Sequence, residues 1–214
     1  VAEILTMPNI NLYGVGVNLT CYGAIIPKQD NLGGLAAIAR KIEAQFDIKL
    51  NVISGGNSSS IYLIWKEGLP EGINNLRLGE SFLLGNDTAY GETVPGCVHD
   101  TMTLEAQIIE LKEKPSLPIG EVGVDAFGEK PYYEDRGMMK RAIIAVGKQD
   151  TDLGGMHPTD TQIEIMGGSS DHTILDVTHA DKGYKVGDVV SFTLEYGAML
   201  KLATSPYVEK AYIK

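Results

Sequence analysis

Cysteine is scarce in this sequence. The 214 residues include two cysteines, Cys21 and Cys97, which are too few for a disulfide framework and do not have metal-ligand spacing. This usage suits a reducing, cytoplasmic compartment. The chain also has no run of the ~20 apolar residues that a membrane-spanning helix needs, and no basic-then-apolar signal segment opens it. We therefore expect neither a membrane partner nor secretion.

Basic residues are also few compared with acidic ones. Lys and Arg number 18 against 28 Asp and Glu, which gives a formal net charge of -10. Such a surface repels phosphate backbones, so we expect no nucleic-acid partner. The two common glycine-rich nucleotide motifs, Gly-x-x-x-x-Gly-Lys-Ser/Thr and Gly-x-Gly-x-x-Gly, are missing as well. With 43% hydrophobic and 21% charged residues, the composition is that of a folded globular protein.

The first part of the chain alternates strand and helix patterns. Apolar β-rich runs predict strands, and apolar residues at helical spacing (Leu35, Ile38, Ile42 and Phe46) predict a helix that Asn31 would cap. The expected order is a strand over 12–17, a helix from about 31, a strand over 48–54, a helix over 61–67 and a strand from 75 that ends near 85. Strand–helix alternation indicates parallel strands joined by right-handed crossovers, and therefore an α/β layer.

Beyond about residue 98 the helical period disappears. Short β-rich segments separated by Gly, Pro and Asp turns predict strands over 101–111, 141–147, 162–166, 173–177, 189–194 and 208–213. This pattern favours an all-β domain built as a small barrel. We therefore expect two domains, 1–92 and 93–214.

Three parallel strands are too few for a free-standing sheet, because both edges would be left unpaired. We expect residues 1–92 to form the last three βα units of a (β/α)8 (TIM) barrel. The chain also begins at Val1 without an initiator Met. The earlier strands, the N-terminal half of the barrel, would then lie upstream of Val1. A small complete α/β layer is the alternative.

Two strand ends in this part carry residues suited to an anion. Ser54-Gly55-Gly56-Asn57-Ser58-Ser59-Ser60 is a glycine-rich turn with hydroxyls, a composition that suits a phosphate but is also common in ordinary turns. Arg77-Leu78-Gly79-Glu80 places a cation two residues before a glycine, although Arg77 could instead pair with Glu80 at the surface. Phosphate sites after strands seven and eight are frequent in TIM barrels, which favours a shared ligand.

These motifs, in this order, resemble a known family. Gly14-Val15-Gly16-Val17-Asn18, Gly56-Asn57-Ser58-Ser59, Leu76-Arg77-Leu78-Gly79-Glu80, Gly147-Lys148-Gln149-Asp150 and Ser169-Ser170-Asp171-His172 are similar to segments of the fold-type III pyridoxal-phosphate (PLP) enzymes. The closest branch is the alanine/ornithine racemase-like one. The resemblance extends over essentially the whole chain, which would be about the last three-fifths of such an enzyme.

The resemblance implies a set of cofactor-binding residues. Arg77 would face the pyridine nitrogen of PLP, and Asn18 matches a position where alanine racemases place a histidine against the ring. The phosphate would be bound by Asn57, by Ser58, by the backbone amides of Gly79 and Glu80, and by the hydroxyl of Tyr207.

Racemisation needs an acid or base on each face of Cα. In the family one of them is the lysine that binds PLP as a Schiff base, and it lies on a barrel strand upstream of this sequence. We therefore expect the chain alone to be inactive. The other is a tyrosine from the partner subunit of a head-to-tail homodimer, where this sequence has a lysine. The candidates that the resemblance leaves open are Lys148, Asp150, Asp171 and His172.

The sequence thus predicts a PLP-dependent racemase of a free amino acid, ornithine-like or alanine-like. His172 could instead be a structural histidine in a tight turn. A fold-type III lyase or dehydratase acting on β-hydroxy amino acids is one alternative, and a metal held by His157, Asp160 and His172 would accompany it, although that set has no recognised ligand spacing. A non-catalytic PLP-binding protein or an inert fragment is the other.

Overall fold

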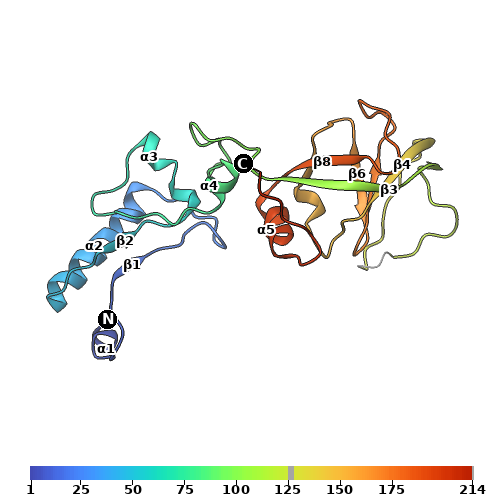
Figure 1. Ribbon diagram of the computed structural model, residues 1–214. Helices are drawn as coiled ribbons and strands as arrows, with labels where there is room; N and C mark the ends of the chain where they lie inside the picture. The colour runs from blue at the N-terminus through green and yellow to red at the C-terminus, as the bar shows by residue number, and fades with distance from the viewer. Residues whose placement is uncertain (125–127, 214) are drawn as a thin grey trace. The chain divides into compact units, whose positions relative to one another are not determined.

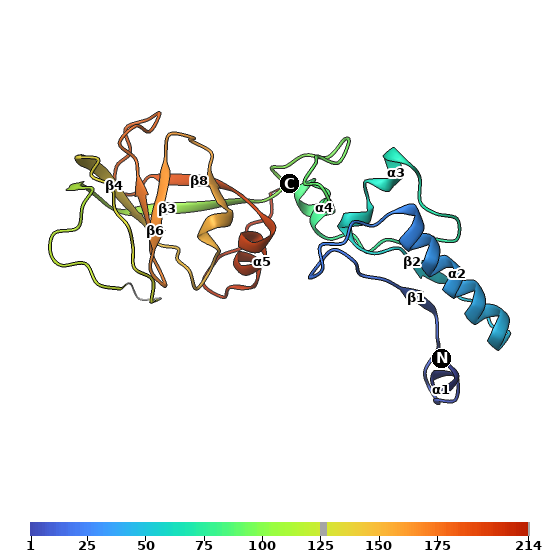
Figure 2. The same ribbon diagram turned by 180° about the vertical axis from the view of Figure 1, so that it is seen from behind.

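The computed structural model describes residues 1–124 and 128–213. The chain divides into two compact units, Val1–Thr101 and Met102–Lys214, each with its own hydrophobic core (Figures 1 and 2). The expected boundary lay earlier, after residue 92. Within the described residues, the helices are all too short or too polar to cross a bilayer.

The first unit is a small α/β layer. Its elements are α1 (Ala2–Leu5), β1 (Gly14–Gly16), α2 (Gln29–Phe46), β2 (Val52–Ser54), the 3-10 helix η1 (Ser58–Ser60), α3 (Leu63–Lys66) and α4 (Glu80–Leu84). Strands β1 and β2 pair in parallel, as expected, with Val15 opposite Ile53. The third expected strand does not form: it is reduced to one parallel bridge between Ser54 and Asn75. Beyond that bridge the chain leaves the ladder, because the Arg77 N–H donates to the Gly56 carbonyl, past the end of β2.

Helix α2 covers this short sheet with a face that the sequence only partly predicted. Leu32, Ala36 and Ala39 are buried, whereas Ile38, which we expected on the inner face, is 54% exposed. Asn31 is not the N-cap either. It lies at the third helical position, where its side-chain oxygen accepts from the Lys28 N–H at 2.8 Å.

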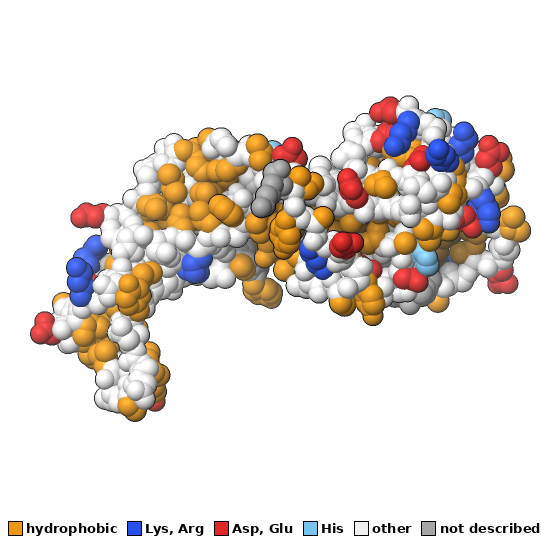
Figure 3. Space-filling view, viewed as in Figure 1, with side chains coloured by type: hydrophobic (Ala, Val, Ile, Leu, Met, Phe, Trp, Pro, Cys, Tyr) orange, Lys and Arg blue, Asp and Glu red, His pale blue; other side chains and the backbone are white. Residues whose placement is uncertain are grey.

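Apolar side chains also gather on the exposed surface of the first unit (Figure 3). Tyr13, Ile38, Ile64 and Phe82 are all at least half exposed.

The second unit is antiparallel. Its elements are β3 (Thr103–Pro115), β4 (Met138–Ile144), the 3-10 helix η2 (Leu153–Gly155), β5 (Met156–Pro158), β6 (Glu164–Gly168), β7 (Thr173–Asp176), β8 (Val189–Leu194) and α5 (Tyr196–Thr204). The strand order is β5-β8-β3-β4-β7-β6. The long β3 pairs with β8 through its first half and with β4 through its second, and a bulge separates Ile108 from Glu110.

The six-stranded sheet curls into a nearly closed barrel, since its two edge strands β5 and β6 line one hollow of about 490 Å³. Side chains that alternate inward, among them Leu104, Ala106 and Ile108, pack on Phe192 in the core. This arrangement agrees with the expected all-β domain.

Two elements of the second unit differ from the expectation. Residues 208–213 do not form a strand, and Tyr212 and Ile213 are more than nine-tenths exposed. The unexpected helix α5 precedes them and buries Ala198, Met199 and Leu202 against the barrel. These three positions have helical spacing, a signal that was present in the sequence.

Candidate functional site

Arg77 joins the carboxyl ends of the two parallel strands. Its Nη1 donates to Ser54 Oγ at 2.6 Å, at the end of β2, and its Nη2 donates to the Val17 carbonyl at 2.8 Å, just after β1. Ser54 in turn donates to the Asn75 side-chain oxygen at 2.7 Å. A Cβ at Gly16 would lie 3.3 Å from Nη1, so a glycine leaves room for the guanidinium. The guanidinium is therefore held by neutral oxygens at the strand ends.

Ser58 lies beside this arginine and collects donors from the following segment. Its Oγ accepts from the Gly79 N–H at 3.3 Å and from both the N–H and the hydroxyl of Ser81 at 3.1 Å. Ser58 is 4% exposed. Amides and hydroxyls that converge on one point form a donor set that a phosphate, an acceptor with several oxygens, can use. The residues present therefore fit a phosphate, and Ser81 is a member of the set that the sequence did not single out.

Asn57 completes this cluster and links it to Asn18. Its side-chain oxygen accepts from the N–H and the hydroxyl of Ser59, at 2.9 and 2.7 Å, and its Nδ2 donates to Asn18 Oδ1 at 3.0 Å. Asn18 Nδ2 donates to Cys21 Sγ at 3.3 Å.

Six of the sequence-predicted cofactor residues thus lie around the same strand ends: Asn18, Asn57, Ser58, Arg77, Gly79 and Glu80, the last of which begins α4. Tyr207 belongs to the second unit and is 79% exposed. Its role at the phosphate stays a prediction.

A second cluster is formed by a four-residue turn between β6 and β7. Asp171 Oδ1 lies 3.0 Å from His172 Nδ1 and accepts from the hydroxyls of Ser169 and Ser170 at 3.1 and 3.3 Å. The hydrogen bond from Ser169 lowers the pKa of Asp171, and the neighbouring His172 adds to this shift. Asp171 is therefore an ionised partner for the imidazole at neutral pH.

The loop that carries Lys148 runs beside this turn. The backbone N–H groups of Lys148 and Gln149 donate to the carbonyls of Ser169 and Ser170, both at 2.9 Å. Gly147 makes this approach possible, because a Cβ there would lie 2.5 Å from the Ser170 carbonyl oxygen and 2.6 Å from the His172 nitrogen. Lys148 is one of the residues that line the hollow between β5 and β6.

Asp150 is placed differently from the other three candidates. Its carboxylate is buried, at 4% exposure, and accepts from the Ser205 hydroxyl at 2.6 Å. The structure therefore ties Asp150 to the segment after α5, away from the Asp171–His172 pair.

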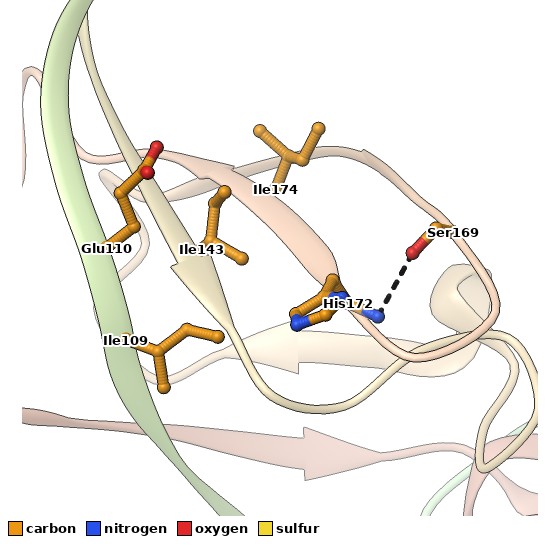
Figure 4. A pocket seen from close by; sticks show the side chains of 6 residues that line it. All are labelled: Ile109, Glu110, Ile143, Ser169, His172 and Ile174. Carbon is orange, nitrogen blue, oxygen red and sulfur yellow. Dashed lines mark hydrogen bonds between the residues drawn. The ribbon is translucent and has the colours of Figure 1, made fainter.

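His172 also borders a hollow of about 470 Å³ on the outer face of the barrel. Figure 4 shows its ring projecting toward Ile109 and Ile143, with Ile174 and Glu110 farther along the same wall. Glu110 contacts Lys112 and Lys114 at 2.8 and 2.7 Å, and these ammonium groups lower its pKa to about 2. The wall is thus apolar near the imidazole and charged at its far end.

The residues of the metal alternative have separate partners. His157 contacts Glu195 at 2.9 Å, His172 contacts Asp171, and Asp160 accepts backbone N–H groups from Gln162 and Asp181. Residues 1–124 and 128–213 contain no group of three His, Cys, Asp or Glu side chains that could hold a metal ion.

Sequence comparison gives two strong matches. The chain is 59% identical over 210 residues, 98% of its length, to an ornithine racemase of Acetoanaerobium sticklandii, and 44% identical over 213 residues to a lysine racemase of Thermotoga maritima. The chain is a relative of the amino-acid racemases. It spans 60% of the length of each of these two racemases. No family model matches it.

Structural comparison agrees with this relationship at the level of fold. The racemase relative superposes on alanine racemase from Bartonella henselae, solved with covalently bound pyridoxal phosphate, with a TM-score of 0.57 at 22% identity. The match covers 90% of this chain and 50% of that one. The chain therefore has an alanine racemase-like fold. Because the match covers 90% of the chain, it includes most of the C-terminal barrel.

Proposed function

We propose that this chain is the cofactor-binding and β-domain part of a PLP-dependent amino-acid racemase. The observation that supports this most is the 59% identity to an ornithine racemase over nearly the whole chain. Because the two named relatives act on ornithine and lysine, we propose an amino acid with a second, distal amino group as the substrate. The first unit would contribute the last strands of a TIM barrel.

Ser58, Ser81 and Gly79 would bind the phosphate. The donors that now converge on Ser58 Oγ are two backbone amides and one hydroxyl, and Ser58 can add its own hydroxyl hydrogen. Asn57 holds the start of η1 in place through Ser59, so the turn is ordered before any ligand arrives. A preorganised donor set of this kind limits the entropy that binding costs.

Arg77 would face the pyridine nitrogen. When bound, PLP draws electron density from the Cα–H bond of the amino acid and so acidifies it. A guanidinium has donors and no acceptor and stays protonated, so a pyridine nitrogen that accepts from Arg77 is hard to protonate. This contact moderates electron withdrawal and favours return of the proton to Cα over side reactions at the cofactor.

His172 would move a proton at Cα. Its Nε2 would accept the proton while Asp171 stabilises the charged imidazole through Nδ1. Lys148, on the adjoining loop, is the second candidate for this role. The base on the other face of Cα would be the Schiff-base lysine outside this sequence. We propose that His172 reaches the cofactor of a second subunit in a head-to-tail homodimer.

The test uses the complete gene product that contains this chain, loaded with PLP. We expect L-ornithine or L-lysine to exchange its Cα hydrogen in D2O and to reach an equal mixture of enantiomers, measured by NMR and chiral chromatography. Cleavage of β-hydroxy amino acids without racemisation would support the lyase alternative instead. Binding of PLP with neither reaction would support the non-catalytic alternative.

A further inference from the structure

Ser169 bonds two neighbours within its own turn. Its hydroxyl donates to Asp171 Oδ1 at 3.1 Å. The same hydroxyl oxygen accepts from the His172 N–H at 3.2 Å (Figure 4). Its backbone N–H donates to the His172 carbonyl at 2.9 Å. One hydroxyl therefore links the carboxylate of the turn to the backbone of the histidine.

This link determines which ring nitrogen of His172 is engaged. Asp171 Oδ1 lies 3.0 Å from Nδ1, and the hydroxyl of Ser169 holds that oxygen in place. An ionised carboxylate only accepts hydrogen bonds, so this contact favours the ring form with the proton on Nδ1 and the lone pair on Nε2. The ring projects into the hollow beside Ile109 and Ile143.

We propose that Ser169 is a positioning residue for His172, acting through Asp171 to keep Nδ1 engaged and Nε2 directed into the hollow. The inference rests on the proposed role of His172 in proton transfer at Cα. Without the hydroxyl, the His172 N–H loses its acceptor and Asp171 loses one of its donors. Both the backbone and the ring of the histidine then gain freedom.

The charges around the ring come from three elements. Asp171 contacts the ring from the same turn, Glu110 lies on the wall of the hollow and is paired with Lys112 and Lys114, and Lys148 is on the adjoining loop. Asp171 is the charge in contact with Nδ1, so the effect of Ser169 on the orientation of the ring passes through it.

Ser170 provides a matched control. Its hydroxyl donates to the same Asp171 oxygen at 3.3 Å, whereas the His172 N–H bonds to Ser169. Ser170→Ala therefore removes the same chemical group and leaves the bridge to the histidine backbone in place.

The first experiment measures kinetics on the complete, PLP-loaded protein. We expect Ser169→Ala to lower kcat about tenfold with little change in KM, because a small misplacement of a reacting group is costly. Ser169→Thr keeps the hydroxyl and restores kcat, and Ser170→Ala changes kcat by less than about threefold. Equal losses in Ser169→Ala and Ser170→Ala would overturn the proposal.

The second experiment does not depend on activity. Excess diethyl pyrocarbonate acylates free imidazole nitrogens, and peptide mass spectrometry resolves each histidine, so that His157 and His179 serve as internal references. We expect a single adduct at His172 in the wild type and in Ser170→Ala, and a second adduct in Ser169→Ala once Nδ1 is released. A single adduct in Ser169→Ala, or no adduct at His172 in the wild type, would contradict the positioning role. If His172→Gln still racemises, the proposed proton transfer fails, while the adduct pattern still decides the role of Ser169.

Discussion

At the scale of single residues, Ser58 contributes a hydroxyl and Arg77 a cation to the same cluster at the strand ends. Arg77 N–H binds the Gly56 carbonyl at 2.8 Å, and Gly79 N–H binds Ser58 at 3.3 Å, so residues 77–79 run directly beside residues 56–58. The sequence separates the two segments by about twenty residues. The fold brings them together because both follow parallel neighbouring segments of one sheet.

Ser58→Ala tests the proposed phosphate contacts. The variant loses a hydroxyl among donors suited to an anion, so we expect the Kd for PLP to rise about tenfold. Fluorescence titration of the complete protein measures it. Ser60→Ala is the control, because it removes a hydroxyl from the same turn whose hydrogen bond goes to the Gly55 carbonyl, at 2.6 Å, and not to Ser58. An equal rise in both variants would point to a general loosening of the turn.

The ion pairs of Glu110 predict how the stability of the protein depends on pH. The pKa of Glu110 is lowered from 4.5 to about 2 by Lys112 and Lys114, so the folded state holds the carboxylate charged where the unfolded chain binds a proton. The stabilisation is therefore complete above the unfolded value and is lost as pH falls through about 2. We expect the difference in unfolding free energy between wild type and Glu110→Gln to be larger at about pH 6 than at about pH 2. Urea titrations at both pH values measure it, and a difference that grows in acid would refute the ion pairs.

At the scale of elements, helix α2 depends on its first turn. Asn31 Oδ1 accepts from the Lys28 N–H, and its Nδ2 donates to the Ile26 carbonyl at 2.9 Å. We expect Asn31→Ala to destabilise the protein by about 1 kcal/mol, as the loss of a capping side chain does. Chemical denaturation measures this, with the exposed Gln45→Ala as control. A loss no larger than that of Gln45→Ala would mean that the helix start is held by packing alone.

The elements that the sequence predicted best are those with a strong local period. The helix over α2, the strand at β2 and most barrel strands follow from apolar spacing. The prediction of a third strand in the first unit was wrong. Residues 75–79 have the pattern of a strand, but their backbone hydrogen bonds go to the Gly55–Gly56 turn. The segment 208–213 was wrong for a similar reason: β-rich composition does not supply a partner strand.

The site shows the same division between local pattern and fold. The sequence singled out the turn over 54–60 because Gly, Asn and Ser are adjacent there, and Arg77 because it is a cation two residues before a glycine. Ser81 was missed, since nothing in the sequence says that its hydroxyl turns back to Ser58. Nothing in the sequence separates Asp150 from the nearby candidate Lys148. Only the fold shows that the Asp150 carboxylate is bonded to Ser205.

At the scale of the whole molecule, two separate cores should respond separately to damage. Phe192 is fully buried in the barrel core, and Leu32 is fully buried in the α/β core. Replacing either by Ala leaves a cavity that costs about 3–5 kcal/mol. Hydrogen exchange of the complete protein should rise in Met102–Lys214 for Phe192→Ala and in Val1–Thr101 for Leu32→Ala. Exchange that rises equally in both units would show a single cooperative fold.

Gly147 carries no functional group, yet the turn with Asp171 and His172 depends on it. Any side chain there would collide with the backbone of Ser170 and His172 and push the two loops apart. We expect Gly147→Ala to lower the activity of the complete protein, although the side chains of Asp171 and His172 are unchanged. Any redesign of this chain should therefore keep glycine at residue 147.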